Sequence, residues 1–483
     1  MPLDHTACHR AICSRDARFD GVFFTAVQTT GIYCRPVCPA RTPKAGNCRF
    51  FASAAEAEHS GFRPCLRCRP ELAPASRRTR ADDAAALVLA QIRSGESAET
   101  GLAALATQLG ITDRHLRRLF VDQYGLPPVA FAQTERLRFA KQLLQETSLS
   151  MTDVAYSAGF KSLRRFHALF QSRYGLTPSL MRGKQSKSPE HDVLTLRLSY
   201  RPPLAWEEML QFLAPRMISG VEVVANGTYR RTVSLGDRQG WLEVQQQPGS
   251  NGLIARVPSC LSFILRPILS RLRRLFDLDA DPVAIAAHLG RERLLAHSLQ
   301  ETPGLRVPGA WDGFELAMRA ILGQQVTVKG ASTLAGRLTE RFGQSIETPF
   351  ADLSIVSPSA ATIAAATVEE IAAVGLPRTR AATLHTLAKA VSEGKLQLDG
   401  HADPFSEMET LQGLPGFGDW TVQYVAMRAL AWPDAFPAGD LGLRKAFGRG
   451  IPVNERILRE KSEAWRPWRS YAAMHLWKML RNV

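Results

Sequence analysis

The spacing of apolar and polar residues predicts a helical region that contains an internal repeat. The stretches "LGITDRHLRRLFVDQYGLPP" and "AGFKSLRRFHALFQSRYGLTP" share a glycine turn, a helix with apolar residues every three or four positions, and a YGLxP exit. This period predicts an amphipathic helix with one buried face. Thr112 and Ser162 stand where each helix would begin, and their side chains can cap it. We therefore expect two related units, each with a helix, a tight turn and a second helix.

The second helix of each unit carries cationic side chains opposite its apolar face. The residues expected inside are Leu105, Ala106, Leu109, Leu116, Leu119 and Phe120 in the first unit and Val154, Ala155, Ala158, Phe166, Leu169 and Phe170 in the second. The residues expected outside are Arg114, His115, Arg117 and Arg118, and Arg164, Arg165 and His167. A cationic helix after a glycine turn is typical of a DNA-binding helix-turn-helix. A plain helical bundle with a solvated basic face is the alternative.

A two-residue period follows this region and predicts strands. In "VLTLRLSYRPP" it places Leu194, Leu196 and Leu198 on one face. Residues 206–216 have the pattern of a helix, and the alternating stretches at 220–235 and 241–246 predict further strands. We expect an antiparallel sheet that serves as a scaffold, before the chain becomes helical near 261–278. From about residue 305 onward, helices dominate.

Two features of the C-terminal half can carry chemistry. "LQGLPGFGDWTVQYVAMRA" predicts a hairpin between two helices, with Leu414, Gly416 and Gly418 at the turn. Backbone amides at the start of the second helix can hold a phosphate, although an ordinary interhelical turn has the same pattern. Asp440 ends a loop rich in proline and glycine, a position that is most often an N-cap.

Composition limits the class of protein. A chain of 483 residues predicts three or four domains, and 45% hydrophobic with 22% charged residues excludes a disordered chain. The net charge of +15 favours a polyanion or an anionic membrane surface as partner, beside the alternative of a merely basic protein. No stretch has the eighteen or so apolar residues of a membrane span, and the N-terminus lacks an apolar signal core. We expect a cytoplasmic protein with reduced cysteines.

Two pairs of cysteines have the spacing of a metal site. Cys34 and Cys38 are followed by Cys65 and Cys68, a pattern typical of tetrahedral zinc. Spacing alone favours a structural zinc module. Four thiolates on Zn²⁺ leave a charge of −2, which nearby arginines would stabilise while they attract DNA phosphate. These arginines are Arg35, Arg41, Arg63, Arg67 and Arg69, and the remaining thiols, Cys8, Cys13, Cys48 and Cys260, fit no pattern.

Residues 19–74 resemble the N-terminal domain of Ada-type DNA alkylation repair proteins, through "TGIYCRPVC" and "FRPCLRCRP". The resemblance implies that Cys34 is both a zinc ligand and the acceptor of a methyl group from DNA methyl phosphotriesters. Cys38, Cys65 and Cys68 would be the other ligands. Residues 80–182 resemble the paired helix-turn-helix domain of AraC-type activators. That likeness implies DNA binding, for which Arg114, Arg118, Arg164 and Arg165 are our candidates.

Residues 190–483 resemble the AlkA-type 3-methyladenine glycosylase II, through the hairpin, Asp440, and the stretches 310–332 and 464–480. The resemblance implies base flipping and an oxocarbenium-like sugar that the Asp440 carboxylate stabilises. It implies a substrate pocket of Trp420, Tyr424 and Trp477, with Gln324 and Gln325 beside the flipped base; tryptophans at helical spacing are otherwise mostly core. Lyase-competent relatives carry a lysine where this chain has Trp420, so we expect a monofunctional enzyme.

The chain departs from those glycosylases at two positions. Gln325 stands where relatives insert a bulky apolar wedge into the gap left by the flipped base. Gly439 precedes Asp440 where the best-known relatives have an acidic residue. Both departures support an alternative, a DNA-binding activator whose glycosylase-like half is catalytically weak or only binds. A further alternative keeps the zinc purely structural.

We therefore predict a multidomain, mainly α protein. Its parts would be a small zinc-bound α/β domain (1–76), a helical double helix-turn-helix region (80–182), an α+β antiparallel-sheet domain (190–304) and an all-α helix-hairpin-helix glycosylase domain (305–483). It would repair alkylated DNA and regulate transcription in response to damage, with zinc as its cofactor. We expect double-stranded DNA and RNA polymerase as partners, and a monomeric chain.

Overall fold

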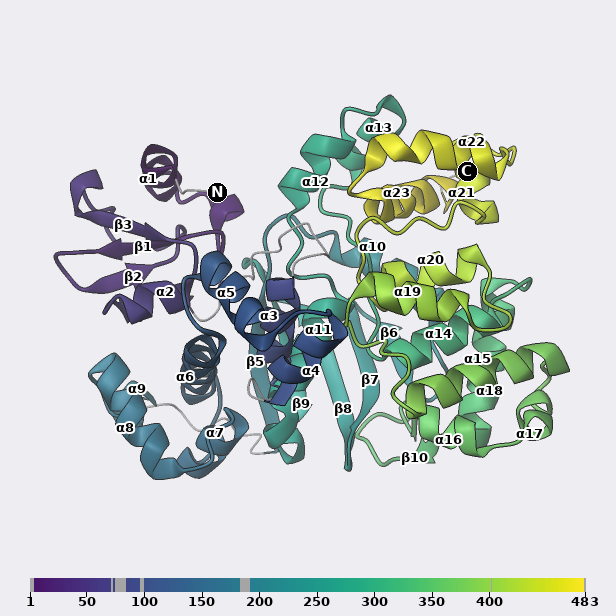
Figure 1. Cartoon of the computed structure of the whole chain (residues 1–483), viewed down its shortest axis with the longest axis horizontal. Helices are drawn as coiled ribbons and strands as arrows, with labels where there is room; N and C mark the ends of the chain where they lie inside the picture. The colour runs from purple at the N-terminus through teal and green to yellow at the C-terminus, as the bar shows by residue number, and fades with distance from the viewer. Residues whose placement is uncertain are drawn as a thin grey trace. The chain divides into compact units, whose positions relative to one another are not determined.

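The computed structural model describes residues 4–70, 73, 84–95, 100–182, 192–400 and 402–481 (Figure 1). The chain divides into two compact units, one of residues 1–202, 247–270 and 278–280, the other of 203–246, 271–277 and 281–483. The polar stretches 71–83 and 182–192, whose composition predicts linkers between domains, fall almost entirely outside the described residues. Across the described ranges, no helix has the length and apolar character that crossing a bilayer requires.

The N-terminal part of the first unit is a small sheet flanked by helices. Its strands are β1 (Phe24–Val27), β2 (Ile32–Cys34), β3 (Cys48–Phe51) and β4 (Arg63–Pro64), in the order β3-β1-β2-β4. Helices α1 (His5–Cys13) and α2 (Ala54–His59) accompany it. Strands β2 and β4 are parallel, with Tyr33 opposite Pro64. Their ends therefore bring the next residues, Cys34 and Cys65, to the same edge of the sheet.

Seven helices follow within the described part of the first unit, and they confirm the predicted repeat. They are α3 (Ala84–Ser94), α4 (Thr100–Gln108), α5 (Asp113–Tyr124), α6 (Pro128–Glu146), α7 (Met151–Ser157), α8 (Leu163–Tyr174) and α9 (Pro178–Arg182). Thr112 caps α5 and Ser162 caps α8, each through its side-chain oxygen. The buried stripes are as expected except that Leu109, Leu119 and Leu169 are only half-buried.

The predicted antiparallel strands are present. In the first unit, β5 (Val193–Ser199) pairs with β9 (Gly252–Pro258), and Leu194, Leu196 and Leu198 face inward as expected. In the second unit, β6 (Glu222–Ala225), β7 (Thr228–Leu235) and β8 (Arg238–Gln246) form a meander. Strand β9 was not predicted, although Leu253, Ala255 and Val257 alternate in the same way and are buried.

The rest of the second unit is built mainly of helices. These are α10 (Trp206–Leu213), α11 (Leu265–Leu275, which begins in the first unit), α12 (Pro282–Leu289), α13 (Arg293–Glu301), α14 (Gly313–Leu322), α15 (Val328–Phe342), α16 (Ala360–Ala365), α17 (Val368–Ala372), α18 (Arg378–Ser392), α19 (Pro404–Gln412), α20 (Asp419–Arg428), α21 (Leu441–Phe447), α22 (Glu455–Ser462) and α23 (Arg469–Arg481). The prediction of an all-α region was wrong in one detail, because the short strands β10 (Gln344–Ser345) and β11 (Ile355–Val356) pair within it. Helix α14 packs against α15, α18 and α20, which places the hairpin helix α20 on a buried, rigid support.

Candidate metal centre and active site

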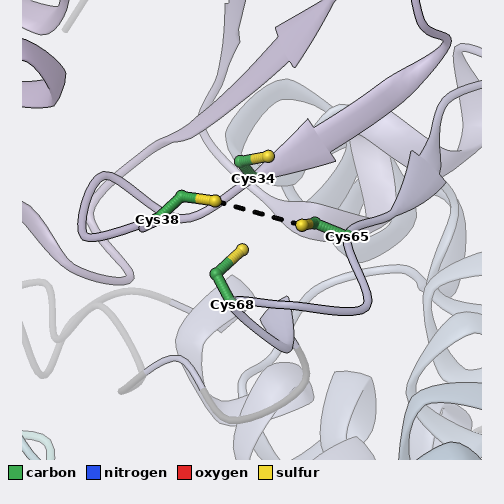
Figure 2. Close-up of side chains that lie close together, drawn as sticks. All are labelled: Cys34, Cys38, Cys65 and Cys68. Atoms are coloured by element: carbon green, nitrogen blue, oxygen red, sulfur yellow. Dashed lines mark hydrogen bonds between the residues drawn. The ribbon is translucent and has the colours of Figure 1, made fainter. Parts of the chain in front are cut away.

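The four predicted cysteines converge on one point (Figure 2). Cys34 ends β2, Cys65 follows β4, and Cys38 and Cys68 come from the turns after these two strands. Their sulfur atoms all lie within 4.8 Å of one another, and those of Cys38 and Cys65 are 3.9 Å apart. Tetrahedral zinc with bonds of about 2.3 Å holds its sulfur ligands about 3.8 Å apart. The cluster therefore fits zinc, which is the cofactor of this domain.

Crowding of the sulfurs decides how they ionise. Hydrogen bonds from Cys34 lower the pKa of Cys38 to about 7, and the pKa of Cys65 is also lowered. Hydrogen bonds with the other three thiols raise the pKa of Cys34 well above its usual value. The four groups thus compete for negative charge, because anionic sulfurs this close repel one another. A cation among them removes the competition and allows every sulfur to be a thiolate.

The arginines around the cluster divide into two groups. The guanidinium of Arg35 pairs with Asp20 and donates to the carbonyl of Cys68 at 3.2 Å, and its backbone N–H points at the Cys68 sulfur at 3.4 Å. Arg69 bridges to Glu146 of α6 at 3.2 Å. Arg35 and Arg69 therefore make contacts within the protein that stabilise its fold. Arg41, Arg63 and Arg67, by contrast, have exposed side chains. Of the five arginines predicted to attract DNA phosphate, only these last three remain candidates.

The sulfurs differ in exposure. Cys65 and Cys68 are buried, each 7% exposed, whereas Cys34 and Cys38 are half-buried. A cavity of about 460 Å³ opens beside them, lined by Cys34, Cys38, Cys65 and the exposed Arg41, Arg63 and Arg67, with apolar side chains making up most of its wall. The apolar part of this lining suits an uncharged ester, and the three arginines suit anionic phosphates next to it. The cluster is therefore more accessible than a sealed structural site.

The other thiols behave as expected. Cys8 and Cys48 are buried in a small apolar core beside Phe23, and burial raises the pKa of both thiols. Cys13 and Cys260 are exposed. The metal-ligand group found among the described residues includes none of these other thiols.

The candidate DNA-contacting arginines lie on the two capped helices. Arg114 and Arg118 of α5 and Arg164 and Arg165 of α8 are exposed, as predicted. Arg117 is different, because its guanidinium is held by Asp113 of the same helix at 2.7 Å. Each of these helices thus presents two exposed arginines in its first half, the part that contacts the major groove in helix-turn-helix proteins.

A second site surrounds Asp440 in the other compact unit. Its Oδ1 accepts from the backbone N–H of Leu443 at 2.9 Å, so Asp440 is indeed the N-cap of α21. The same oxygen accepts from Nε1 of Trp477 at 2.9 Å, and Oδ2 accepts from Nε1 of Trp420 at 3.1 Å. The side chain remains half-buried. Asp440 is therefore a helix cap whose carboxylate also faces two indoles.

The three predicted aromatic residues form one wall. Trp420 and Tyr424 are stacked with ring centroids 5.3 Å apart and an interplanar angle of 12°, and Trp477 meets Tyr424 edge-on at 6.4 Å. All three are half-buried, so they are not core residues. Phe212 of α10 adds a ring 6.1 Å from Trp477. Sequence reasoning missed Phe212, because it belongs to the ordinary apolar face of a predicted helix.

Two arginines back this wall. Arg428 donates to the hydroxyl of Tyr424 at 2.8 Å and to the carbonyls of Pro308 and Gly309. The guanidinium of Arg216 lies 3.8 Å from the ring centroid of Phe212. Burial alone would raise the pKa of Tyr424, but Arg428 and Arg216 outweigh it and the pKa is lowered. The two guanidinium groups therefore make the surroundings of the aromatic wall less electron-rich than its rings alone would.

The hairpin adopts the predicted form. At Gly416 the backbone φ is +86°, and a Cβ there would lie 2.2 Å from Oγ1 of Thr383, so only glycine fits. Helix α20 begins after Gly418 without a side-chain cap, which leaves its first amides for a ligand or water. Gln324 donates to the Gly416 carbonyl and to Oγ1 of Thr421, both at 3.1 Å. Gln324 thus supports the hairpin.

Gln325 lies at the exposed turn between α14 and α15. Its backbone has φ of +57°, an uncommon value for a residue other than glycine. The side chain is exposed, as is that of the neighbouring Val326. An exposed, strained position of this kind is consistent with a residue that projects toward a partner.

Comparison with known proteins agrees with these sites. Four family models match, in chain order: the metal binding domain of Ada (7–71), a helix-turn-helix domain (105–184), the AlkA N-terminal domain (195–312) and the HhH-GPD superfamily of base excision DNA repair proteins (318–469). A Mycobacterium tuberculosis protein named "Probable bifunctional transcriptional activator/DNA repair enzyme AlkA" is 39% identical over 100% of this chain and 98% of its own. The chain belongs to this family of bifunctional Ada/AlkA proteins.

Two further relatives match the C-terminal half. DNA-3-methyladenine glycosylase 2 of Escherichia coli is 35% identical over 58% of this chain and 95% of that protein. The solved 3-methyladenine DNA glycosylase of Archaeoglobus fulgidus, 24% identical, covers 59% of this chain and 98% of its own with a TM-score of 0.52. This structural likeness shows that the second half has the same fold.

Proposed function

We propose that this member of the bifunctional Ada/AlkA family repairs alkylated DNA by two chemistries and activates transcription when DNA is damaged. One observation carries the proposal: four sulfurs lie within 4.8 Å around an accessible Cys34, and a separate unit presents the Asp440 carboxylate among aromatic rings. The four matching domains and the printed names of the relatives support it.

In the first chemistry, Cys34 accepts a methyl group from a DNA methyl phosphotriester. Cys34, Cys38, Cys65 and Cys68 would hold the zinc ion, whose charge would keep the Cys34 sulfur anionic at neutral pH. The sulfur attacks the methyl carbon, an S–C bond forms, and the C–O bond breaks with its electron pair leaving on the phosphate. Because the thioether is stable, each protein molecule accepts one methyl group. Arg41, Arg63 and Arg67 would hold the flanking phosphates.

The same transfer provides the switch. With zinc bound, replacing one thiolate ligand with a thioether would change the charge of the cluster from −2 to −1, and its repulsion of DNA would weaken. The helix-turn-helix units would then bind promoter DNA through Arg114, Arg118, Arg164 and Arg165. We include RNA polymerase as a second partner, a monomeric state and a cytoplasmic location in this proposal, with domain limits at residues 76, 80, 182, 190 and 304.

In the second chemistry, the C-terminal half excises alkylated purines such as 3-methyladenine. Trp420, Tyr424 and Trp477 would enclose the flipped base, with Leu414, Gly416 and Gly418 at the DNA backbone and Gln325 in the vacated gap. As the C–N bond breaks, its electron pair leaves on the base, and Asp440 stabilises the cationic sugar and orients the attacking water. Trp420 leaves no amine there for a lyase reaction.

A second candidate function is an activator whose C-terminal half only binds DNA. Gln325 and Gly439 favour it, since both differ from the residues of well-known glycosylases. Methylated duplex DNA decides between the two. Purified protein that releases more than one free 3-methyladenine per molecule is an enzyme, because a binding module cannot turn over.

Methyl acceptance is tested by mass spectrometry. Zinc-loaded protein is mixed with duplex DNA that carries methyl phosphotriesters, and the peptide with Cys34 is expected to gain one methyl group. Cys34→Ala should abolish the gain, whereas Cys13→Ala, which removes an exposed thiol outside the cluster, should not. An unmodified Cys34 in the wild-type protein would leave zinc with a structural role only.

A further inference from the structure

A carboxylate lies against the loop that ends in Asp440. Gly439 has no side chain, and a Cβ placed on it would be 3.1 Å from Oε2 and 3.5 Å from Cδ of Glu455. The backbone of Gly439 is not in the left-handed region, so the turn itself does not need glycine. What the missing side chain provides is room. The carboxylate of Glu455 occupies the place that a side chain at position 439 would take.

Glu455 reaches this place from a helix that begins 16 residues after Gly439. It is the first residue of α22, whose start is fixed by Asn454, because Oδ1 of Asn454 accepts from the backbone N–H of Arg456 at 2.8 Å. Oε1 of Glu455 accepts from Arg459 at 2.6 Å, which leaves Oε2 as the oxygen nearest Gly439. The position of the carboxylate is therefore set by the helix and by Arg459.

Arg459 continues the connection to the hairpin helix. The same Nη2 that holds Glu455 also donates to Oδ2 of Asp419 at 2.9 Å. Asp419 is the first residue of α20 and precedes Trp420, whose indole donates to Asp440. Two routes therefore lead from α20 toward this loop: the indole that hydrogen-bonds to Asp440 directly, and the chain of Asp419, Arg459 and Glu455, which ends with a carboxylate beside Gly439.

We propose that Glu455 is a positioning residue of the glycosylase site: from α22 it supplies the carboxylate that the Asp440 loop lacks at Gly439 and, through Arg459 and Asp419, holds that loop against α20. The inference rests on the proposed excision of alkylated bases. It explains the departure at Gly439, because an acidic side chain there would compete with Glu455 for the same space and would repel it.

We expect the contacts among Asp419, Glu455 and Arg459 to affect the rate of base release more than the stability of the fold. The side chains of Asp419, Glu455 and Arg459 are 40%, 45% and 46% exposed, and ion pairs this exposed contribute little to stability. A carboxylate beside the residue that precedes Asp440, by contrast, would add to the negative potential around that loop and limit how far the loop can move. A loss of Glu455 should therefore appear in the rate of base release.

The test is a charge exchange between the two positions. In base release from methylated duplex DNA, Glu455→Gln should lower kcat roughly 10- to 100-fold, the effect of a small displacement of a positioned group, with a smaller change in KM. Gly439→Asp alone should also lose activity, because its carboxylate meets that of Glu455. The double variant Gly439→Asp with Glu455→Gln should recover to within about threefold of wild type, as coupled neighbours do.

Two controls separate charge from shape and position. Gly439→Asn with Glu455→Gln has the same shape without the charge and should not recover. Glu460→Gln removes another exposed carboxylate of α22, paired with Arg456 at 3.8 Å, and should keep wild-type kcat. Melting temperatures should stay within about 2 °C, as expected for exposed ion pairs.

The inference is overturned if Glu455→Gln keeps wild-type kcat, or if the double variant is no better than the worse single variant. Asp440→Asn, measured in parallel, distinguishes failure of this inference from failure of the proposed function. If Asp440→Asn also retains base release, the proposed function itself fails. If it loses base release while Glu455→Gln does not, only the role of Glu455 fails.

Discussion

Asp440 shows why a single residue can fit two interpretations at once. One carboxylate oxygen caps α21 through Leu443, and each oxygen accepts a hydrogen bond from an indole, that of Trp477 or of Trp420. Capping fixes the carboxylate at the start of a helix, and its half-buried position leaves it open to a substrate. The local sequence predicts the cap, and only the spatial approach of Trp420 and Trp477 distinguishes it from an ordinary one.

The indole of Trp420 should therefore matter beyond its ring. Trp420→Phe keeps an aromatic ring against Tyr424 but removes the donor to Oδ2 of Asp440. We expect kcat for base release to fall roughly 10- to 100-fold, because the carboxylate loses an orienting partner. Trp432→Phe, which alters a tryptophan packed against Phe405 on another part of the unit, should leave kcat unchanged. Equal effects of both changes would contradict the role of this hydrogen bond.

The buried carboxyl group of Glu58 should make the stability of the metal-binding domain depend on pH. Burial raises the pKa of Glu58 to about 7, although the hydrogen bond from Tyr33 and the charges of Arg138, Arg173 and Lys141 oppose the shift. The folded state thus binds this proton more tightly than the unfolded state does. Stability from this group is complete below the unfolded pKa of about 4.5 and is lost as the pH rises through about 7.

Hydrogen-exchange mass spectrometry of peptides covering β2 and α2 measures this effect. Between pH 5 and pH 8 the wild-type free energy of opening should fall by roughly 3 kcal/mol at most. Glu58→Gln mimics the protonated form and should remove most of this slope. An unchanged slope in Glu58→Gln would show that another group is responsible.

At the scale of elements, helices and strands with a regular apolar period were predicted correctly, and those with an interrupted period were missed. The helices capped by Thr112 and Ser162, the strand with Leu194, Leu196 and Leu198, and the hairpin at Gly416 all follow from local sequence. Strand β9 was missed because it directly precedes the helical stretch near 261–278 and because Ile254, an apolar residue between Leu253 and Ala255, interrupts the alternation of apolar and polar residues. The strands β10 and β11 are two residues each, too short for any period to show.

The recognition helices α5 and α8 should bind DNA phosphate or bases through their exposed arginines. For nonspecific duplex DNA, the slope of log K against log salt becomes shallower by about 0.9 for each phosphate that the protein no longer neutralises. Arg164→Ala with Arg165→Ala should reduce the slope by up to about 1.8 if both arginines bind phosphate. Arg117→Ala should change it less, because Asp113 already holds that guanidinium. Identical slopes for all variants would exclude these helices from DNA binding.

At the scale of the whole molecule, the sequence predicted sites made of neighbouring residues better than sites assembled across the chain. The four cysteines form two short motifs, and their spacing already indicated a tetrahedral ion. The aromatic wall beside Asp440, by contrast, also takes Phe212, Arg216 and Arg428 from segments of the chain that lie up to more than 200 residues apart. Nothing in the local pattern of Phe212 or Arg216 marks them, so only the fold identifies them.

Removal of zinc should affect the first unit and leave the second unchanged. All eight tryptophans lie between Trp206 and Trp477, within the second unit, so their fluorescence reports the unfolding of that unit. A chelator should abolish methyl acceptance and destabilise the domain around Cys34, because metal binding contributes directly to the folding of such sites. The tryptophan transition and the rate of base release should not change. A parallel loss of base release would show that the metal centre supports both activities.

The central claim is that one chain presents two separate reactive sites, a metal-held thiolate and a carboxylate, to alkylated DNA. The most direct measurement is multiple-turnover release of 3-methyladenine from methylated duplex DNA, with methylation of the Cys34 peptide read from the same samples. We predict that Asp440→Asn lowers base release by roughly 10² to 10⁴ and keeps Cys34 methylation, while Cys34→Ala keeps base release and loses methylation. Wild-type base release in Asp440→Asn, or wild-type methyl uptake in Cys34→Ala, would contradict the account.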